Sequence, residues 1–440
     1  MQLDGTEWRP ARPLDAINPE TSPADEGTMS KLARAPMLVT FAALAAFYVT
    51  YRGFAPQTLG DYGPEAAPAM SALLAGHIHS FFALEPAYGG SLLLRAPASL
   101  LAKALGADRL AIYRAGTFPC VLACGLLGAW LTTRMRQRSQ PLAAWLPVLL
   151  ICALAPLLTD AVLHGHPEEA LGGSLCVAAV LLAANSRATL AGLALGVAIV
   201  TKQWGVLALA PALLAVPEGP ASRGARARLI AVAVALPAIQ LLVAHLETAG
   251  APAALVGGAQ QAGFAHAFDL WWPLAHASRQ LAFGSPPWWI VNWSPPGVVA
   301  AHAHELIVAL SVPLGALVVR RRGWNPPVEA CLALLALLFL LRCVLDPQDL
   351  YYYHLPMILA LAAWESYTRR AAPWLTLSTL VLLYVVFDQI GATDAHTWAD
   401  FASYLAVTVP LGGYLLARLL GHPIRRNSVI APLSAATARQ

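Results

Sequence analysis

The chain has 440 residues, of which 58% are hydrophobic and only 12% are charged. Its mean hydropathy is +0.59 and its formal net charge is +4. Soluble globular proteins carry about 25% charged residues, so this composition excludes a soluble globular protein and predicts an integral membrane protein. The small positive charge is better explained by membrane orientation than by binding to nucleic acid, which we exclude as a partner.

The two ends of the chain are polar. Residues 1–30 are rich in proline, aspartate and glutamate and lack the apolar core of a signal peptide, so we expect a disordered cytoplasmic tail. Residues 427–440 predict a second, shorter cytoplasmic tail. The intervening residues 31–426 predict one membrane-embedded helical domain.

Between the tails, apolar segments follow one another along the chain. A transmembrane helix takes about 20 mostly apolar residues, and about twelve segments are candidates. They begin near Ala35, Ala115, Pro141, Ala170, Thr189, Gly205, Leu229, Val298, Val328, Leu355, Trp374 and Leu405. We therefore predict an all-α, polytopic membrane bundle. The two segments that flank Lys202 are short, so we expect them to be half-length or tilted.

The charges predict the orientation of this bundle. With the N-terminus inside, most of the 28 lysines and arginines fall in inner connections, and each of these connections carries at least one arginine. Acidic residues and histidines gather in the outer connections, of which 52–114 and 247–296 are long. We predict a multi-pass protein of the cytoplasmic membrane with both termini cytoplasmic and an active site that faces outside.

The first outer loop carries two candidate catalytic carboxylates, Asp61 and Glu65. The apolar segments 66–75 and 92–105 that follow are too short to span a bilayer and predict interfacial helices. A carboxylate held over the mouth of the bundle is a candidate general base toward an acceptor hydroxyl. Asp61 is also consistent with an ordinary turn or helix-cap residue, since Gly-Asp pairs mark turns.

The second outer loop concentrates titratable side chains between two spans. They are Asp160, His164, His166, Glu168 and Glu169. Such a group suits acceptor binding or acid/base catalysis, while a divalent metal is possible but not favoured. The carboxylates after Pro167 are also typical of an ordinary helix start, where the helix dipole favours negative charge.

Lys202 is one of only three lysines and lies between two apolar runs. An ionisable group at membrane depth is costly and is a functional candidate by default. Arg342 and His354 flank a third outer motif, residues 346–356. We predict that the three side chains form one pocket for a donor phosphate, because cations on rigid elements suit this anion. Tyr352 is a candidate acceptor-binding residue, although tyrosines are common at membrane interfaces.

Other features are less specific. The long outer loop holds tryptophans that suit sugar stacking or, as we favour, the membrane interface: Trp271, Trp272, Trp288, Trp289 and Trp293. The six cysteines lie in or beside apolar runs without a CxxC spacing, which favours buried apolar residues over metal ligands or disulfides. The sequence contains no Walker A loop, which argues against a nucleotide-driven pump.

Taken in order, these features resemble the GT-C superfamily of integral-membrane glycosyltransferases, and within it the actinobacterial polyprenyl-phosphate-mannose-dependent mannosyltransferases. The likeness rests on Asp61 with its interfacial helices, on the small-residue segment 191–201 followed by Lys202, and on the aromatic–Leu-Pro segment 351–356. It implies an all-helical fold, a lipid-linked sugar donor and Asp61 as the base. It also implies that Lys202 and His354 lie near the donor phosphate.

This resemblance and the outer carboxylates together predict an inverting membrane glycosyltransferase. We expect it to move mannose, or another hexose or pentose, from a polyprenyl-phosphate donor to a glycolipid or polysaccharide acceptor of the cell envelope. No cofactor is predicted, and the expected partners are membrane lipids, the donor and the acceptor. A secondary transporter of an anionic envelope precursor is the alternative. A non-catalytic scaffold for envelope assembly is a third hypothesis.

Overall fold

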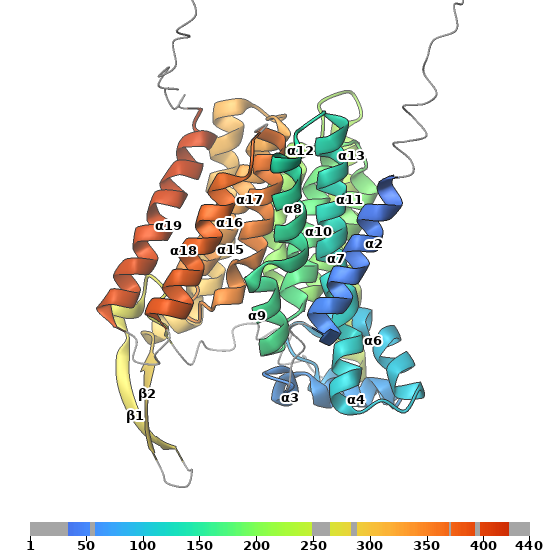
Figure 1. Cartoon of the computed structure of the whole chain (residues 1–440), viewed down its shortest axis with the longest axis vertical. Helices are drawn as coiled ribbons and strands as arrows, with labels where there is room; N and C mark the ends of the chain where they lie inside the picture. Colours follow the sequence, from blue (N-terminus) through green and yellow to red (C-terminus); the bar gives the residue numbers. More distant parts are fainter. Residues whose placement is uncertain are drawn as a thin grey trace, which may run out of the picture.

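The computed structural model describes residues 34–52, 58–248, 265–282, 288–368, 371–391 and 397–421. The predicted tails, residues 1–30 and 427–440, lie outside the described residues. The described chain forms an upright bundle of helices (Figure 1). The first helix, α2 (Arg34–Phe47), begins at the end of the bundle where the last helix, α19 (Trp398–Leu419), also finishes. We call this the terminal end and the opposite one the site end.

Among the described residues, six helices are long and apolar enough to cross a membrane, so the protein is membrane-embedded. They are α7 (Arg109–Gln137), α8 continued by α9 (Leu142–Leu154 and Pro156–His164), α13 (Ser222–Thr248), α15 (Gly297–Arg322), α16 (Val328–Leu345) and α19. The prediction of a polytopic helical bundle is confirmed to this extent, and the number of about twelve spans stays a prediction.

The remaining predicted spans are shorter helices within the same bundle. These are α2 with the turn η1 (Tyr48–Arg52), α10 (Glu168–Ala184), α11 (Ala188–Thr201), η2 (Gln203–Ala208) with α12 (Leu209–Ala215), α17 (Leu355–Thr368), and α18 (Trp374–Tyr384) with η5 (Val385–Ile390). Two central helices form the core, because nearly every side chain in 331–340 of α16 and 355–364 of α17 is buried. All six cysteines are buried and unbridged, as predicted.

The helix pair around Lys202 is interrupted, as its short apolar runs predict. α11 ends at Thr201, Lys202 adopts an extended conformation with φ −151° and ψ 128°, and η2 follows at once. Small residues allow α11 to lie close to α13: a Cβ at Gly192 would lie 2.6 Å from the carbonyl oxygen of Leu229. Close backbone contact of this kind is how membrane helices commonly pack. It fixes the depth at which Lys202 leaves the helix.

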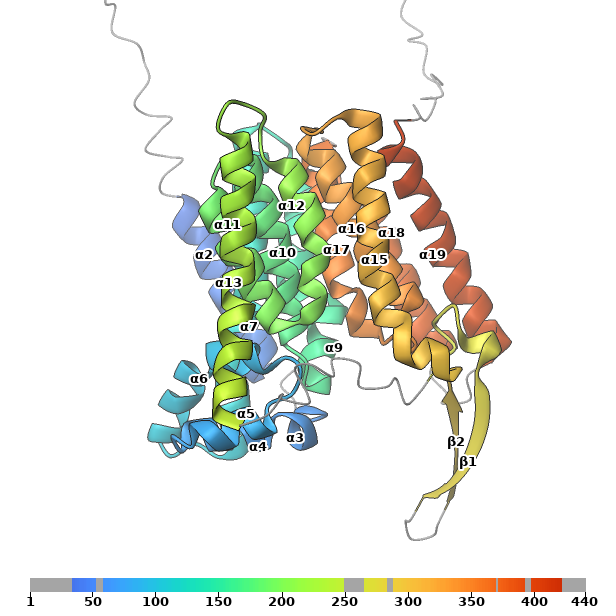
Figure 2. The ribbon, with the colours of Figure 1, turned by 180° about the vertical axis from the view of Figure 1, so that it is seen from behind.

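Four short helices lie across the site end, where interfacial helices are predicted. They are α3 (Tyr62–Glu65), α4 (Ala67–Leu74), α5 (Ile78–Leu84) and α6 (Gly89–Ala104). Their apolar faces meet in a small core of their own that includes Met70, Phe81 and Leu92. α13 extends beyond the neighbouring helices and reaches α5 (Figure 2). The first outer loop is thus a folded layer attached to the bundle.

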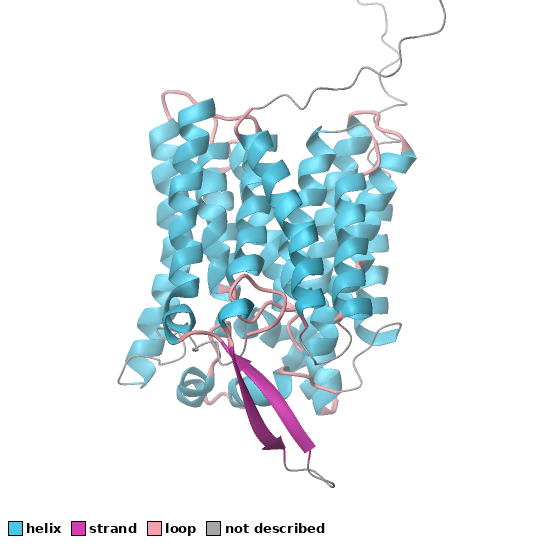
Figure 3. Cartoon of the chain, turned by 90° about the vertical axis from the view of Figure 1, so that its left-hand side faces the viewer, coloured by secondary structure: helices cyan, strands magenta, loops and turns pink. Residues whose placement is uncertain are grey.

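A β-hairpin is the one departure from the all-α prediction among the described residues. After the turn η3 (Trp272–Leu274), strands β1 (His276–Ala282) and β2 (Trp288–Ser294) pair antiparallel, with His276 opposite Ser294. The hairpin projects from the site end (Figure 3). Its second strand reads Trp-Trp-Ile-Val-Asn-Trp, and aromatic and β-branched residues favour strands. The tryptophan-rich loop therefore has structure of its own.

Candidate active site

Two adjacent carboxylates at the start of α10 organise the site end. Glu168 and Glu169 are fully buried. Oε1 of Glu168 lies 3.3 Å from Nζ of Lys202, and its Oε2 lies 3.7 Å from Nη1 of Arg95. Glu169 accepts two hydrogen bonds from Arg342, at 3.1 and 3.2 Å. The two glutamates therefore join α6, the helix break and α16.

Two glycines allow the first and second outer loops to touch. Gly60 and Gly165 have positive φ angles of 52° and 95°, which favour glycine. A Cβ at Gly165 would lie 2.5 Å from the amide nitrogen of Tyr62, and one at Gly60 would lie 2.7 Å from the backbone of His164. The amide of Asp61 donates to the carbonyl of His164 at 2.9 Å. This close approach places Asp61 beside the second loop.

Asp61 and His166 form the exposed end of the network. Oδ2 of Asp61 lies 3.5 Å from Nε2 of His166, whose Nδ1 lies 2.8 Å from Oε1 of Glu168. The Asp61 side chain is 53% exposed, whereas that of His166 is 6% exposed. A buried imidazole thus connects a half-exposed carboxylate to a fully buried one.

The protonation states follow from these contacts. The hydrogen bond from His166 lowers the pKa of Asp61 below its ordinary value, so Asp61 is ionised at neutral pH. Burial alone would lower the pKa of His166, but the charge of Glu168 and the hydrogen bond to Asp61 outweigh it and raise that pKa to about 9. His166 is therefore a cation at neutral pH, and it orients the Asp61 carboxylate.

Aromatic side chains enclose the charges. The hydroxyl of Tyr88 donates to Oε2 of Glu65 at 2.6 Å, and Nζ of Lys202 lies 4.5 Å from the centre of the Tyr88 ring. The ring of Tyr352 stacks on His166 with a 5.2 Å centroid distance. A cation over an aromatic face is held by the ring quadrupole. Glu65 and Tyr352 thus belong to the same cluster as Lys202 and His166.

Two predicted residues lie on the exposed rim of the cluster. Nδ1 of His164 lies 3.0 Å from Oδ1 of Asp160, one turn apart on α9, and the His164 side chain is 56% exposed. The ring of His164 also stacks on Tyr352 at 5.7 Å. The structure therefore brings together every predicted carboxylate and two of the three predicted cations.

His354 is the exception because its side-chain contacts lie elsewhere, and the single donor-phosphate pocket of Lys202, Arg342 and His354 stays a prediction. Nε2 of His354 lies 3.1 Å from the Tyr404 hydroxyl and 3.4 Å from Oδ2 of Asp349, in a separate buried cluster. His354 forms no hydrogen bond with either cation. Burial lowers its pKa to about 3, so it is neutral. The two cations are paired with carboxylates, Lys202 with Glu168 and Arg342 with Glu169.

Two groups of side chains in the described residues are of the types that bind metals. In the His-x-His segment of the second loop, His166 is engaged by Asp61 and Glu168, and His164 is engaged by Asp160. Elsewhere in the described chain, ligand atoms of Cys343, Asp349 and His354 lie within 4.8 Å of one another, and all three residues are buried. That group borders the charge network, since Arg342 and Cys343 both donate to the carbonyl of Tyr353. The expectation that no metal is required stays a prediction.

Sequence reasoning missed several members of the cluster. Arg95 is 1% exposed and lies 5.0 Å from the centre of the Tyr62 ring. The sequence does carry a pattern that indicates its burial: Ser91, Arg95 and Ser99 recur at one-turn spacing and form the buried face of α6. Trp204, whose Nε1 donates to Glu169 at 3.3 Å, directly follows the Lys202 segment but has no pattern that indicates this contact.

No protein-family model matches the chain, and no curated protein matches it significantly. The fold and the site therefore define its class by themselves. It is a membrane-embedded helical protein with a buried network of charged side chains at one end of the bundle, covered by a layer of short helices.

Proposed function

We propose that the protein is a membrane glycosyltransferase that takes its sugar from a polyprenyl-phosphate donor. The observation that carries the proposal is Asp61, a half-exposed carboxylate at the site end whose Oδ2 is held by the buried His166. A fixed, ionised carboxylate at the mouth of a membrane bundle is suited to accept a proton from an acceptor hydroxyl. Glu65, which Tyr88 holds by a hydrogen bond, is the second candidate base.

The proposed reaction is a single displacement with inversion. The acceptor hydroxyl oxygen bonds to the anomeric carbon of the sugar, and the bond from that carbon to the phosphate oxygen breaks. The phosphate leaves with the bonding electron pair, and the hydroxyl proton passes to Asp61. Because the pKa of Asp61 is low, the proton moves once the forming bond has made the hydroxyl acidic. The donor itself supplies the driving force, so no nucleotide is needed.

Lys202 is the residue that we propose for the leaving phosphate. Its side chain is 14% exposed, while Glu168 and Glu169 lie at 3.3 and 3.6 Å from Nζ. An ammonium on a flexible stem can exchange one partner for another, whereas a guanidinium held at two points is fixed. Arg342 is held in that way by Glu169. It therefore keeps Glu169 in place, and fixed positive charge near the leaving group favours its departure.

The charge distribution supports an active site outside the cell. Arginines near the ends of α7, α15 and α19 gather at the terminal end, and the titratable cluster lies at the site end. By the positive-inside rule the terminal end is cytoplasmic. The proposed acceptor is then a glycolipid or polysaccharide of the cell envelope. The short apolar helices complete the proposed set of about twelve spans.

One observation favours a second candidate, a secondary transporter of an anionic envelope precursor. The break between α11 and η2 places Lys202 in extended backbone beside fully buried carboxylates. Interrupted helices with ionisable groups form the substrate sites of many transporters. Against this, Asp61, His164 and Asp160 bring the charges to the exposed rim rather than confining them to the centre of the bundle.

The two candidates differ in one experiment. Purified protein is given synthetic polyprenyl-phosphate-mannose with a radiolabelled sugar, together with membrane lipid extract as acceptor, and then donors with other hexoses and pentoses. The glycosyltransferase proposal expects labelled product from at least one donor. No product from any donor, together with uptake of labelled sugar phosphate into proteoliposomes that Lys202→Ala abolishes, would replace it by the transporter.

A further inference from the structure

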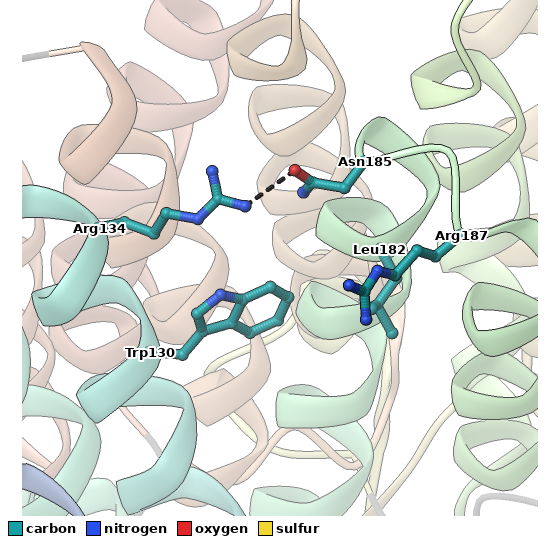
Figure 4. Close-up of a pocket in the computed structure, with 5 residues that line it drawn as sticks. All are labelled: Trp130, Arg134, Leu182, Asn185 and Arg187. Carbon is teal, nitrogen blue, oxygen red and sulfur yellow. Dashed lines mark hydrogen bonds between the residues drawn. The ribbon is translucent and has the colours of Figure 1, made fainter. Parts of the chain in front are cut away.

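A cavity of about 420 Å³ opens at the terminal end, away from the charge network. It lies between the last turns of α7 and the junction of α10 with α11, and it is lined by Trp130, Arg134, Leu182, Asn185 and Arg187. Figure 4 shows the two arginines reaching toward the same space, with the indole of Trp130 beside it. Nothing in the proposed reaction uses these side chains.

The two arginines of this cavity differ from others at the same end. The guanidiniums of Arg136 and Arg138 lie 5.2 and 4.7 Å from the centres of the Trp145 and Tyr367 rings. Arg226 donates to three backbone carbonyls. These three cations are engaged within the protein, whereas Arg134 and Arg187 line the cavity.

Arg134 and Arg187 keep most of their donors for a ligand. Arg134 donates from Nη2 to Oδ1 of Asn185 at 2.8 Å, which orients its guanidinium toward the cavity. Within the described part of the chain, neither arginine forms a salt bridge and the guanidinium of Arg187 forms no hydrogen bond. Two guanidiniums that converge on one space suit an anion with several oxygens, above all a phosphate, which each can bind through two donors.

The surroundings of the cavity favour a lipid as the source of that phosphate. The arginines sit where apolar helices end, which in a membrane is the depth of the lipid headgroups. Trp130 lies one turn deeper on α7 and is half-buried, as is Leu182 on α10. Tryptophan belongs at this interface, and basic pockets between membrane helices bind anionic headgroups. The indole and the leucine offer an apolar surface to the acyl chain below the headgroup.

We propose that this cavity binds the phosphate headgroup of an anionic phospholipid, with Arg134 and Arg187 on the phosphate oxygens and Trp130 and Leu182 against the chain. The proposal does not depend on the glycosyltransferase reaction. It makes the junction of α7, α10 and α11 a lipid site on the face opposite the active site.

The test compares lipid binding by delipidated, detergent-purified protein in native mass spectrometry, with phosphatidylglycerol and phosphatidylcholine as probes. Wild type is expected to bind phosphatidylglycerol more tightly. Arg134→Gln/Arg187→Gln should weaken that binding by about tenfold or more, because charge-assisted hydrogen bonds to the phosphate are lost. The matched control, Arg320→Gln/Arg321→Gln, removes the same charge from exposed positions at the same end and should bind as wild type does.

Three results would overturn the proposal. Equal binding of the two lipids by wild type would remove the headgroup preference, and an equal loss in the control would reduce the effect to overall charge. Inorganic phosphate that binds as tightly as the lipid would make the cavity a site for the free anion. Arg134→Lys/Arg187→Lys keeps the charge but loses the two-donor geometry, so it should recover only part of the affinity, which separates a binding defect from a folding defect.

Discussion

Nζ of Lys202 lies 3.3 Å from Oε1 of Glu168, so the lysine that interrupts one helix is paired with the carboxylate that begins another. Taking charges out of water costs free energy that their attraction repays only when the geometry is good. Such a pair is therefore weak support for stability by itself. The pair bears on the site itself, because the Glu168 carboxylate also orients His166 and, through His166, Asp61.

The effects of substitutions at Lys202 and Glu168 should be coupled, because the two side chains form one buried pair. Lys202→Met leaves Glu168 with one cation fewer in a fully buried position, and we expect a loss of about 3–5 kcal/mol in the free energy of unfolding. Glu168→Gln removes a partner of Arg95 and His166 as well, so Lys202→Met/Glu168→Gln should not regain wild-type stability, but its loss should be smaller than the sum of the two single losses because both single variants already break the same pair. Thermal unfolding in detergent, followed by tryptophan fluorescence, measures all three variants. Additive losses in the double variant would contradict the coupling.

The pair of Asp61 and His166 should make stability depend on pH. The pKa of His166 is about 9 in the folded protein, above the ordinary value of about 6.5. A histidine whose pKa is raised by folding stabilises the folded state fully at a pH below its ordinary pKa. This contribution is lost as the pH rises through the pKa in the folded protein. Its size is about 3 kcal/mol for a shift of this extent.

His166→Gln isolates this effect. The difference in unfolding temperature between wild type and His166→Gln should be largest near about pH 6 and should shrink toward about pH 10. Asp61 affects stability at low pH instead. Because its pKa is lowered, its contribution to the free energy of unfolding is lost only in acid. A constant difference between the two proteins across this range would show that His166 is not a cation in the folded state.

Glu85 should have the opposite dependence on pH. It is 2% exposed, and burial raises its pKa to about 7 despite a hydrogen bond from Gln240 at 3.4 Å. A carboxyl group whose pKa is raised by folding destabilises the folded state once the pH exceeds its ordinary pKa. The destabilisation grows until the pH exceeds the pKa in the folded protein. Glu85→Gln should therefore be more stable than wild type at about pH 8, by up to about 3 kcal/mol, and close to wild type in acid. Glu218 is exposed, so the control substitution Glu218→Gln should leave stability unchanged at both pH values.

The contact between the two outer loops can be tested at Gly165. Alanine there adds a Cβ 2.5 Å from the amide of Tyr62 at a φ of 95°, and we expect a loss of about 1–3 kcal/mol in stability and of most transfer activity. Gly106→Ala is the matched control, because Gly106 also has a positive φ, of 78°, but has nothing within 4 Å of its Cβ position. Equal effects of the two substitutions would mean that backbone strain alone, and not the loop contact, matters.

The sequence predicts the parts of this protein better than their pairing. Hydropathy places the apolar helices and the layer at the site end because both depend on local periodicity. The position of Lys202 at a helix break also follows from its two short apolar runs. The partners do not: Arg95 meets Glu168, and Arg342 meets Glu169, through tertiary packing that no local pattern records.

His354 shows the converse, that residues close in the sequence need not share contacts in the structure. It stands close to Arg342 in the sequence, yet its ring contacts Tyr404 and Asp349 from η4 (Tyr351–His354) and forms no hydrogen bond with Arg342 or Lys202. The direction of a side chain at a helix start depends on which helix packs beside it, here α19. The hairpin was missed for a related reason, since its first strand, His276–Ala282, has a mixed composition that favours no structure by itself.

The most direct test of the proposed base is sugar transfer from synthetic polyprenyl-phosphate-mannose, or the donor sugar found active, by wild type, Asp61→Asn and Glu65→Gln. Asp61→Asn keeps the size of the side chain but removes the base, so we expect transfer to fall by about 10²–10⁴-fold. Glu65→Gln should retain far more activity. Full transfer by a folded Asp61→Asn protein, with transfer lost in Glu65→Gln, would contradict the assignment of Asp61 as the base.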